Sequence, residues 1–319
     1  MEGTIPDKPV HMTSQILIRP CRPEDLRAVW ETFLSSFQDM IRRVYGTRQS
    51  LRGMRRVPPY LRHVLATDAQ GFWVAESNTK VIGFVCSIVR GSIWFLCDFW
   101  IVPEFQNRGI GRQLLKRSLQ SDRPYRITST YSSLYPPAMR SYIMLGMTPQ
   151  FPIYTLVCRS KDLKPTWAAE REIKICELDP TGSQGGIREA VHEMSSIDKV
   201  ARGSGRNEDH ELFIKRSGNR CWLAKKSDRT IGYFYISPKG QVGPLAVKDT
   251  RAMLPVLHQA IESAARLHPG LTIQIPSPNV ESIRELIRAG FRIDSHAIFM
   301  SSREFGKMEN YIISGPALF

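Results

Sequence analysis

Several common functional patterns are missing from this sequence of 319 residues. No G-x-x-x-x-G-K-[ST] run occurs, which excludes a P-loop nucleotide site. The seven histidines show no metal-ligand spacing with Cys, Asp or Glu, so we expect no metal. The longest apolar run, residues 81–102, is interrupted at Arg90 and contains Asp98. Two paired strands therefore explain it better than a membrane span, and we expect no membrane partner.

Paired cysteines are also absent. The six cysteines form no C-x-x-C motif, and several lie inside apolar runs, where a buried thiol behaves as a small hydrophobic side chain. No secretory leader pattern is present. We therefore expect a reducing, cytoplasmic location.

Acidic residues are scarce in the first half. The net charge is +14, and residues 1–160 carry 21 Lys and Arg against 11 Asp and Glu. One stretch has no acidic residue and seven arginines: Arg42, Arg43, Arg48, Arg52, Arg55, Arg56 and Arg62. Two interpretations stay open, a solvated basic loop and a surface for an anionic acceptor or nucleic acid.

The most informative pattern lies between residues 93 and 120. An apolar, aromatic and β-branched run from Ile93 to Val102 predicts a buried strand, and helical periodicity follows from Gly109 to Leu119. The turn between them reads QNRGIG over residues 106–111. Its two glycines let backbone N–H groups approach a ligand at a helix N-terminus, where a side chain would block that approach. Such a turn is an anion site.

This region resembles the acetyl-CoA-binding motif of the GNAT acetyltransferases. The turn matches Q-x-x-G-x-G between V-P-E-F and G-R-Q-L-L, and a second GNAT-like element, A-x-x-x-Y-x-x-x-G-M, follows at residues 138–147. The alternative is a glycine-rich strand-to-helix turn of an ordinary α/β protein. The resemblance implies acetyl-CoA as co-substrate, with its pyrophosphate on the turn and its pantetheine on a splayed strand end near residues 100–102. The residues implied to hold it are Ile101, Val102, Gln106, Asn107, Arg108, Gly109, Ile110, Gly111 and Arg112.

The resemblance also implies two catalytic residues. Tyrosine at the position of Tyr142 usually protonates the leaving thiolate, although a packing role is the alternative. Asp98 is the leading candidate for the base, because family members that act on amines often carry a carboxylate there and apolar neighbours would raise its pKa. A structural carboxylate bonded to an arginine or to backbone amides is equally open. Glu104, in the turn, is less favoured.

The second half repeats the first in outline. Trp73 and Gly83 have counterparts in Trp222 and Gly232 at the same spacing, and residues 279–291 echo the helix that carries Tyr142. We predict a mixed α/β (α+β) chain of two GNAT-like domains, each a mixed, mostly antiparallel sheet flanked by helices. The expected divisions are a flexible tail at 1–13, a catalytic domain at 14–160, a linker at 161–172 and a degenerate domain at 173–319.

The second half lacks the elements that bind the cofactor. Residues 248–252 contain no glycine, and Leu286 replaces the tyrosine. One acetyl-CoA per chain is therefore expected. A polar stretch of this half either lines an acceptor cleft between the domains or forms a surface loop, and its charged residues are Asp198, Arg202, Arg206 and Asp209.

The sequence thus predicts an N-acetyltransferase that acts on a primary amine of a small molecule or peptide, and an anionic acceptor would suit the arginine-rich stretch. The alternative is a non-catalytic acyl-CoA sensor whose arginine-rich surface binds a protein partner or nucleic acid. Retention of both Asp98 and Tyr142 in the first half favours the enzyme.

Overall fold

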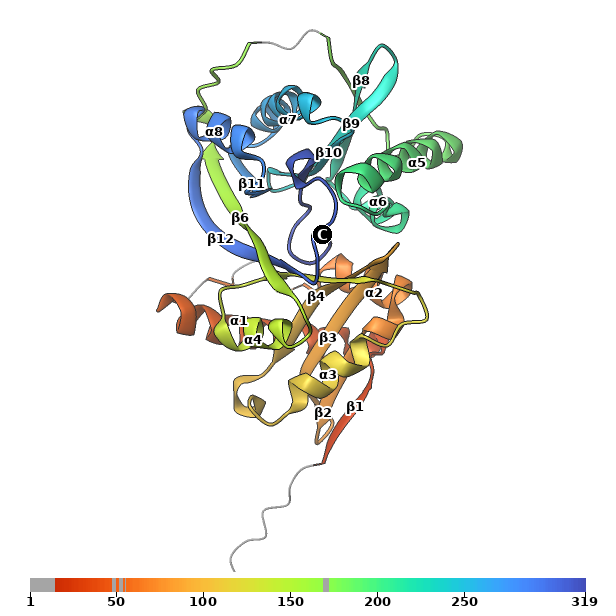
Figure 1. Ribbon diagram of the computed structural model, residues 1–319, viewed down its shortest axis with the longest axis vertical. Helices are drawn as coiled ribbons and strands as arrows, with labels where there is room; N and C mark the ends of the chain where they lie inside the picture. Colours follow the sequence, from red (N-terminus) through yellow and green to blue (C-terminus); the bar gives the residue numbers. More distant parts are fainter. Residues whose placement is uncertain (1–14, 48–49, 52–53, 55, 169–171) are drawn as a thin grey trace, which may run out of the picture.

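The computed structural model describes residues 15–319 except 48–49, 52–53, 55 and 169–171 (Figure 1). The predicted tail at 1–13 and three of the seven arginines, Arg48, Arg52 and Arg55, lie outside the described residues. The first half contains strands β1 (Ile16–Pro20), β2 (Trp73–Ser77), β3 (Lys80–Arg90), β4 (Ile93–Ile101), β5 (Ile127–Ser132) and β6 (Thr148–Arg159). Its helices are α1 (Leu26–Tyr45), α2 (Pro59–Thr67), α3 (Ile110–Ser118) and α4 (Pro136–Ile143).

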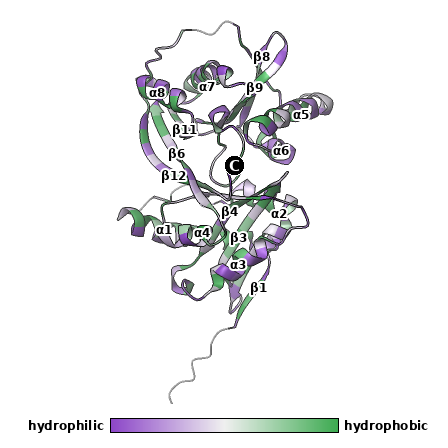
Figure 2. Cartoon of the chain, viewed as in Figure 1, coloured by the Kyte–Doolittle hydropathy of each residue, from purple (hydrophilic) through white to green (hydrophobic). Residues whose placement is uncertain are grey.

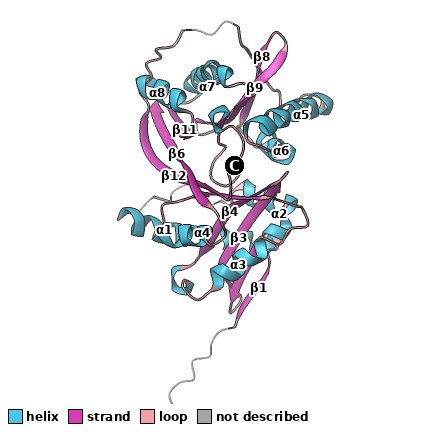
Figure 3. Ribbon diagram, in the orientation of Figure 1, coloured by secondary structure: helices cyan, strands magenta, loops and turns pink. Residues whose placement is uncertain are grey.

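The second half repeats this order of helices and strands with one additional strand at its end (Figure 3). Its strands are β7 (Lys174–Glu177), β8 (Arg220–Lys226), β9 (Arg229–Ile236), β10 (Gln241–Val247), β11 (Gly270–Pro276), β12 (Arg292–Ser301) and β13 (Tyr311–Ile312). Its helices are α5 (Gln184–Ala201), α6 (Asn207–Lys215), α7 (Met253–Leu267) and α8 (Val280–Arg288).

The hairpin turns show why the two halves fold alike locally. Asn78 and Thr79 connect β2 to β3 with φ of 48° and 63°, and Ser227 and Asp228 connect β8 to β9 with φ of 48° and 61°. Two consecutive residues with positive φ form the tight turn whose twist matches that of the paired strands. The same type of tight turn therefore joins β2 to β3 in the first half and β8 to β9 in the second.

The two halves share a single sheet through exchanged strands. Its order is β1-β2-β3-β4-β5-β12-β6-β11-β10-β9-β8-β7. β6, the last strand of the first half, pairs antiparallel with β11, and β12 pairs antiparallel with β5. Figure 1 shows β6 and β12 side by side between the halves. The mixed sheet flanked by helices confirms the predicted fold class, whereas the division into separate domains stays a prediction.

Three apolar clusters pack against this sheet. One lies between β3, β4 and the helices α1 and α2, and it continues into α5, α6 and β9 of the second half. A second lies under α7 and α8, and a third lies between α3, α4 and strands β2 to β4. In Figure 2, β3 is predominantly hydrophobic, in agreement with its almost complete burial. The first cluster therefore joins the halves by apolar packing as well as by strand pairing.

Three further features bear on the expectations from sequence. Among the residues described, no helix combines the length and apolar character needed to cross a bilayer. All six cysteines are free thiols, and Cys176 alone of the six is exposed. Within the same part of the chain, no group of three or more His, Cys, Asp or Glu side chains is placed to hold a metal ion.

Candidate active site

The central strands β4 and β5 separate partway along their length. They pair in parallel from Ile93 and Ile127 as far as Leu96 and Thr130, after which β4 continues to Ile101 without β5 beside it. The register of β4 against β3 shifts at this point, so that Cys97 is an additional residue. A bulge of this kind bends the strand and increases its twist. The sequence-predicted splay thus begins after Leu96, and it leaves backbone groups of β4 available on one edge.

The turn after β4 presents an uncapped helix N-terminus. Asn107 and Gly109 have φ of 62° and 78°, and Gly109 is the residue that precedes α3. No side chain accepts a hydrogen bond from the first turn of α3. Because the N–H groups of the first helical turn have no partner within the helix, they form a site for an anion.

Gln106 joins this turn to the strand. Its side-chain amide donates to the carbonyl of Ile101 at 2.9 Å, and its oxygen accepts a hydrogen bond of 3.4 Å from the Tyr135 hydroxyl. Arg108 lies over the Phe105 ring, 5.1 Å from its centroid. Gln106 therefore fixes the turn against the end of β4, and its side chain is committed to the protein rather than directed at a ligand.

The two glycines of the turn are under different constraints. Gly109 has no atom within 4 Å of the place a Cβ would take, so its requirement is the positive φ. A Cβ on Gly111 would lie 2.8 Å from the Phe99 ring and 3.2 Å from the Ile101 side chain. A side chain at Gly111 would therefore be crowded by Phe99 and Ile101 where α3 packs on β4.

We expect Gly111→Val to lower the free energy of unfolding by about 1–3 kcal/mol, the usual cost of overpacking a filled interior. Urea denaturation measures this loss. Combining Gly111→Val with Phe99→Leu, which removes the far end of the ring, should recover part of it, because the two side chains compete for one space. Gly109→Ala is the matched control, since only its backbone conformation is strained. If the losses in free energy of unfolding from Gly111→Val and Phe99→Leu simply added in the double variant, this packing would be contradicted.

Asp98 is buried and its carboxylate is held by neutral donors. The Tyr60 hydroxyl donates to one oxygen at 2.6 Å, and the Trp100 indole N–H donates to the other at 2.9 Å. Burial raises the pKa of Asp98 to about 6, although both hydrogen bonds act to lower it. Neither an arginine nor a backbone amide is among these partners. The alternative of a structural carboxylate bonded to such groups therefore does not describe Asp98. A carboxyl with this pKa is suited to accept a proton near neutral pH.

Tyr142 approaches the same region from the other face of the sheet. It is buried beside α3, with Ile110 and Leu114 in its apolar cluster, whereas Asp98 bonds to α2 on the opposite face. Burial raises the pKa of the Tyr142 hydroxyl, and the Asp98 charge adds to the rise. No hydrogen bond from this hydroxyl is found within the described ranges. The phenol is therefore neutral at physiological pH, in the form that donates a proton.

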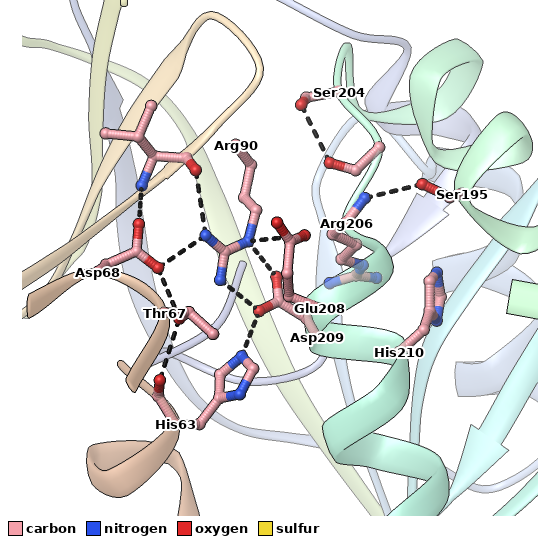
Figure 4. Close-up of polar contacts among 12 residues, drawn as sticks. His63, Thr67, Asp68, Arg90, Ser195, Ser204, Arg206, Glu208, Asp209 and His210 are labelled. Atoms are coloured by element: carbon pink, nitrogen blue, oxygen red, sulfur yellow. Dashed lines mark hydrogen bonds and ion pairs between the residues drawn. The ribbon is translucent and has the colours of Figure 1, made fainter. Parts of the chain in front are cut away.

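The remaining predicted residues lie elsewhere. Glu104 is exposed in the turn, as expected. Arg42 and Arg43 pair with Asp39, at 2.7 and 2.6 Å, so an acidic residue just before the arginine-rich stretch neutralises part of it. The surface-loop interpretation is wrong for the polar stretch of the second half, because four of its residues are almost completely buried: Asp198, Arg202, Arg206 and Asp209. Figure 4 shows two of them, Arg206 and Asp209.

Sequence reasoning missed Tyr60. It is the second residue of α2, within the arginine-rich stretch, and is 38 positions from Asp98, so no local pattern connects the two. It also missed a half-exposed aromatic group beside Asp98, in which Phe33 and Phe37 stack at 5.4 Å and both meet Trp100 edge-on. Phe33 and Phe37 are four residues apart, a spacing that indicates an apolar helix face but not an aromatic group beside a carboxylate.

The corresponding region of the second half is filled by the chain itself. β10 and β11 pair only at residues 241–242 and 272–273 before they separate, and β13 pairs with β10 in the resulting gap. The turn after β10 is closed as well, because the Asp249 side chain accepts a hydrogen bond of 2.9 Å from the Arg251 N–H. An acidic cap repels an anion where the first half has free N–H groups.

Comparisons with known proteins agree with this architecture. Residues 31–143 match the family described as the acetyltransferase (GNAT) family. An uncharacterized N-acetyltransferase of Methanocaldococcus jannaschii is 24% identical over 110 residues, which span 32% of this chain and 46% of that protein. An uncharacterized N-acetyltransferase of Archaeoglobus fulgidus is 23% identical over 110 residues, 32% of this chain and 71% of that protein. The match thus covers about half the length of the first relative.

Solved structures extend the likeness in fold to the whole chain. A putative acetyltransferase of Pyrococcus horikoshii has a TM-score of 0.71 at 15% identity, covering 99% of this chain and 100% of that one. A tandem GNAT protein from the clavulanic acid biosynthesis pathway has a TM-score of 0.55 at 13% identity, covering 91% and 100%. The fold is that of two GNAT units in tandem. The match to the acetyltransferase (GNAT) family thus lies in the first half, at residues 31–143, and the likeness of the whole chain to these structures is one of fold.

Proposed function

We propose that this protein is an N-acetyltransferase that transfers the acetyl group of acetyl-CoA to a primary amine of a small molecule or peptide. The observation that carries the proposal is the splay of β4 from β5, which lies beside the uncapped α3 turn and between Asp98 and Tyr142. These residues fit acetyl-CoA, because the free N–H groups suit a pyrophosphate and the open strand edge suits the amides of pantetheine. Only the first half offers this combination.

Acetyl-CoA, when bound, supplies the acetyl group as an activated thioester. Asp98 accepts a proton from the attacking amine at one carboxylate oxygen, and its pKa of about 6 leaves it ionised at neutral pH. The Tyr142 hydroxyl donates a proton to the departing sulfur from the other face of the sheet. The direction of proton movement follows from the two environments. Asp98 is an ionised carboxylate with a raised pKa and takes up a proton, whereas the neutral phenol of Tyr142 gives one up.

The aromatic group of Phe33, Phe37 and Trp100 borders the Asp98 side of the splay. Aromatic rings contribute large apolar contact areas, and their faces attract a cationic amine. We propose that the acceptor carries its amine on an apolar body that packs against these rings. The exposed arginines Arg56 and Arg62 do not contribute to this surface through any contact found in the described structure.

Release of free CoA thiol tests the function directly. The intact protein is incubated with acetyl-CoA and a panel of primary amines, from aliphatic and aromatic monoamines to amino acids, aminoglycosides and peptide N-termini. Release that depends on an amine and disappears in Asp98→Asn supports the enzyme. Binding of acetyl-CoA without amine-dependent release from any member of the panel would favour the non-catalytic sensor.

We expect calorimetric titration of the full chain to give one acetyl-CoA site. The reason is physical occupancy, since β13 takes the gap in the second half and Asp249 caps its turn. Gly109→Val, which strains the first-half turn, should remove this single site and leave no residual binding. Two sites in the wild type, or a site that survives in Gly109→Val, would contradict the assignment.

A further inference from the structure

Helix α2 contacts the candidate active site and the second half from two neighbouring positions. Tyr60 donates its hydrogen bond to Asp98 at 2.6 Å. One turn later His63 shares a hydrogen bond of 2.8 Å with Asp209, a residue of α6 in the second half. Residues three apart in a helix lie on the same side, so one short helix joins the two contacts.

The Asp209 side chain is itself held in place by its neighbours. It is fully buried, and Arg90 at the end of β3 grips its two oxygens at 3.0 and 2.7 Å (Figure 4). Burial alone would raise the pKa of Asp209, but the Arg90 charge and the His63 hydrogen bond hold it below its usual range. The carboxylate therefore stays ionised and can hold the His63 ring across the boundary between the halves.

The end of α2 is held by the same group of residues. The Thr67 hydroxyl donates to the His63 carbonyl at 3.0 Å, and the neighbouring Asp68 pairs with Arg90 at 2.8 Å. Figure 4 shows Arg90 between Asp68 of the first half and Asp209 of the second, with His63 also bonded to Asp209. The position of α2 is thus coupled to the second half through one arginine and one histidine.

Helix α2 cannot fix its own position. It has nine residues, and no side chain caps its start. Helices this short are unstable in isolation, so tertiary contacts decide where such a helix lies. Apart from the polar contacts at Tyr60 and His63, its inward face is anchored by Leu61 and Val64, both completely buried. Apolar contacts tolerate small shifts that a hydrogen bond of 2.6 Å does not.

We infer that Asp209 of the second half acts through His63 as a positioning residue, holding α2 so that Tyr60 keeps the Asp98 carboxylate in its working orientation. The second half, which lacks an open cofactor cleft of its own, thereby sets the geometry of the catalytic carboxyl in the first. This inference rests on the proposed function in taking Asp98 as the proton acceptor, but its physical core, the coupling of Asp209 to Asp98, is measurable without an acceptor.

The coupling is tested by titrating the Asp98 carboxyl with carbon NMR on protein labelled at aspartate, the signal being assigned by its loss in Asp98→Asn. The groups facing Asp98 are Tyr60, Cys86, Cys97, Trp100 and Tyr142. Tyr60→Phe removes a hydrogen bond that lowers its pKa, so the pKa should rise above about 6. His63→Leu should raise it in the same direction, although His63 itself bonds to Asp209 rather than Asp98.

His63→Gln is the conservative variant, because its amide can still donate to Asp209, and it should restore the wild-type titration. Glu177→Gln breaks an exposed pair with Arg220 in the second half and serves as the matched control with no shift expected. An unchanged Asp98 titration in folded His63→Leu would overturn the inference. So would a shift that His63→Gln reproduces in full, since that would indicate an effect of the imidazole itself.

The kinetic arm uses the amine identified by CoA release. His63→Leu should lower kcat about tenfold with little change in the affinity for acetyl-CoA, as small misplacements of reacting groups do. In the Tyr60→Phe variant, His63→Leu should lower kcat little further, because the hydrogen bond from Tyr60 to Asp98 is already absent. If the double variant instead lost kcat by the product of the two single losses, the coupling would be overturned. Failure of the proposed function is distinguishable, because it would leave the NMR shifts intact and remove amine-dependent release in the wild type.

Discussion

Asp98→Asn is expected to lower kcat by at least about 10²-fold, the contribution of a positioned general base. Asparagine keeps the size of the side chain and can still accept one hydrogen bond, from Tyr60 or Trp100, but it cannot take a proton. Steady-state CoA release measures the loss, and calorimetry should show nearly unchanged acetyl-CoA affinity. A variant with wild-type kcat would return Asp98 to a structural role.

The rate and the stability should change with pH in opposite directions. Because only the ionised carboxylate accepts a proton, the wild-type rate should rise with pH through about 6 and then level off. Stability should move the other way. The pKa of Asp98 is higher folded than unfolded, so its ionisation costs about 3 kcal/mol of folding free energy, absent below pH 4 and complete above pH 6. Asp98→Asn should flatten both dependences between about pH 4 and 6.

Tyr142→Phe is expected to lower kcat by about 10²-fold or more, with acetyl-CoA affinity unchanged. Phenylalanine fills the same space among Ile110 and Leu114 and removes only the hydroxyl, for which the described structure offers no hydrogen-bond partner. The free energy of unfolding should therefore change little, in contrast to the Gly111→Val variant.

A thiol leaving group of lower basicity distinguishes proton donation from packing. If Tyr142 supplies a proton to the sulfur, the defect of Tyr142→Phe should shrink with an acetyl donor whose thiol is more acidic than CoA. Equal defects with both donors, or no loss of kcat with either, would leave Tyr142 a packing residue.

The sequence predicted best what depends on local pattern. The strand from Ile93 and the helix after Gly109 follow from hydrophobic periodicity, and each lies within a few residues of its predicted bounds. The glycine turn was also recognisable, because positive φ at Gly109 is a local requirement. The different role of Gly111 was not, since the Phe99 ring that excludes a side chain there belongs to the preceding strand.

Features that join distant parts of the chain were beyond local pattern. Tyr60 and Asp98 are neighbours only because α2 packs on β4, and Asp209 reaches Arg90 across 119 positions. The sequence gives only part of the reason to expect no cofactor site in the second half. Missing glycines were visible in residues 248–252, whereas the insertion of β13 depends on where the chain returns after β12. Pairing of this kind carries no signature within either strand.

The exchange of β6 and β12 makes the covalent connection between the halves nearly redundant. β6 of the first half pairs with β11 of the second, and β12 of the second pairs with β5 of the first, so we expect two fragments cut between β6 and β7 to stay joined by strand pairing. Conversely, neither half can be cut out as a working piece, because residues 173–319 alone would expose the bare edge of β11, and residues 14–160 alone that of β5. We therefore expect inserted residues to be tolerated better between β6 and β7 than within β6 or β12, whose pairing joins the two halves.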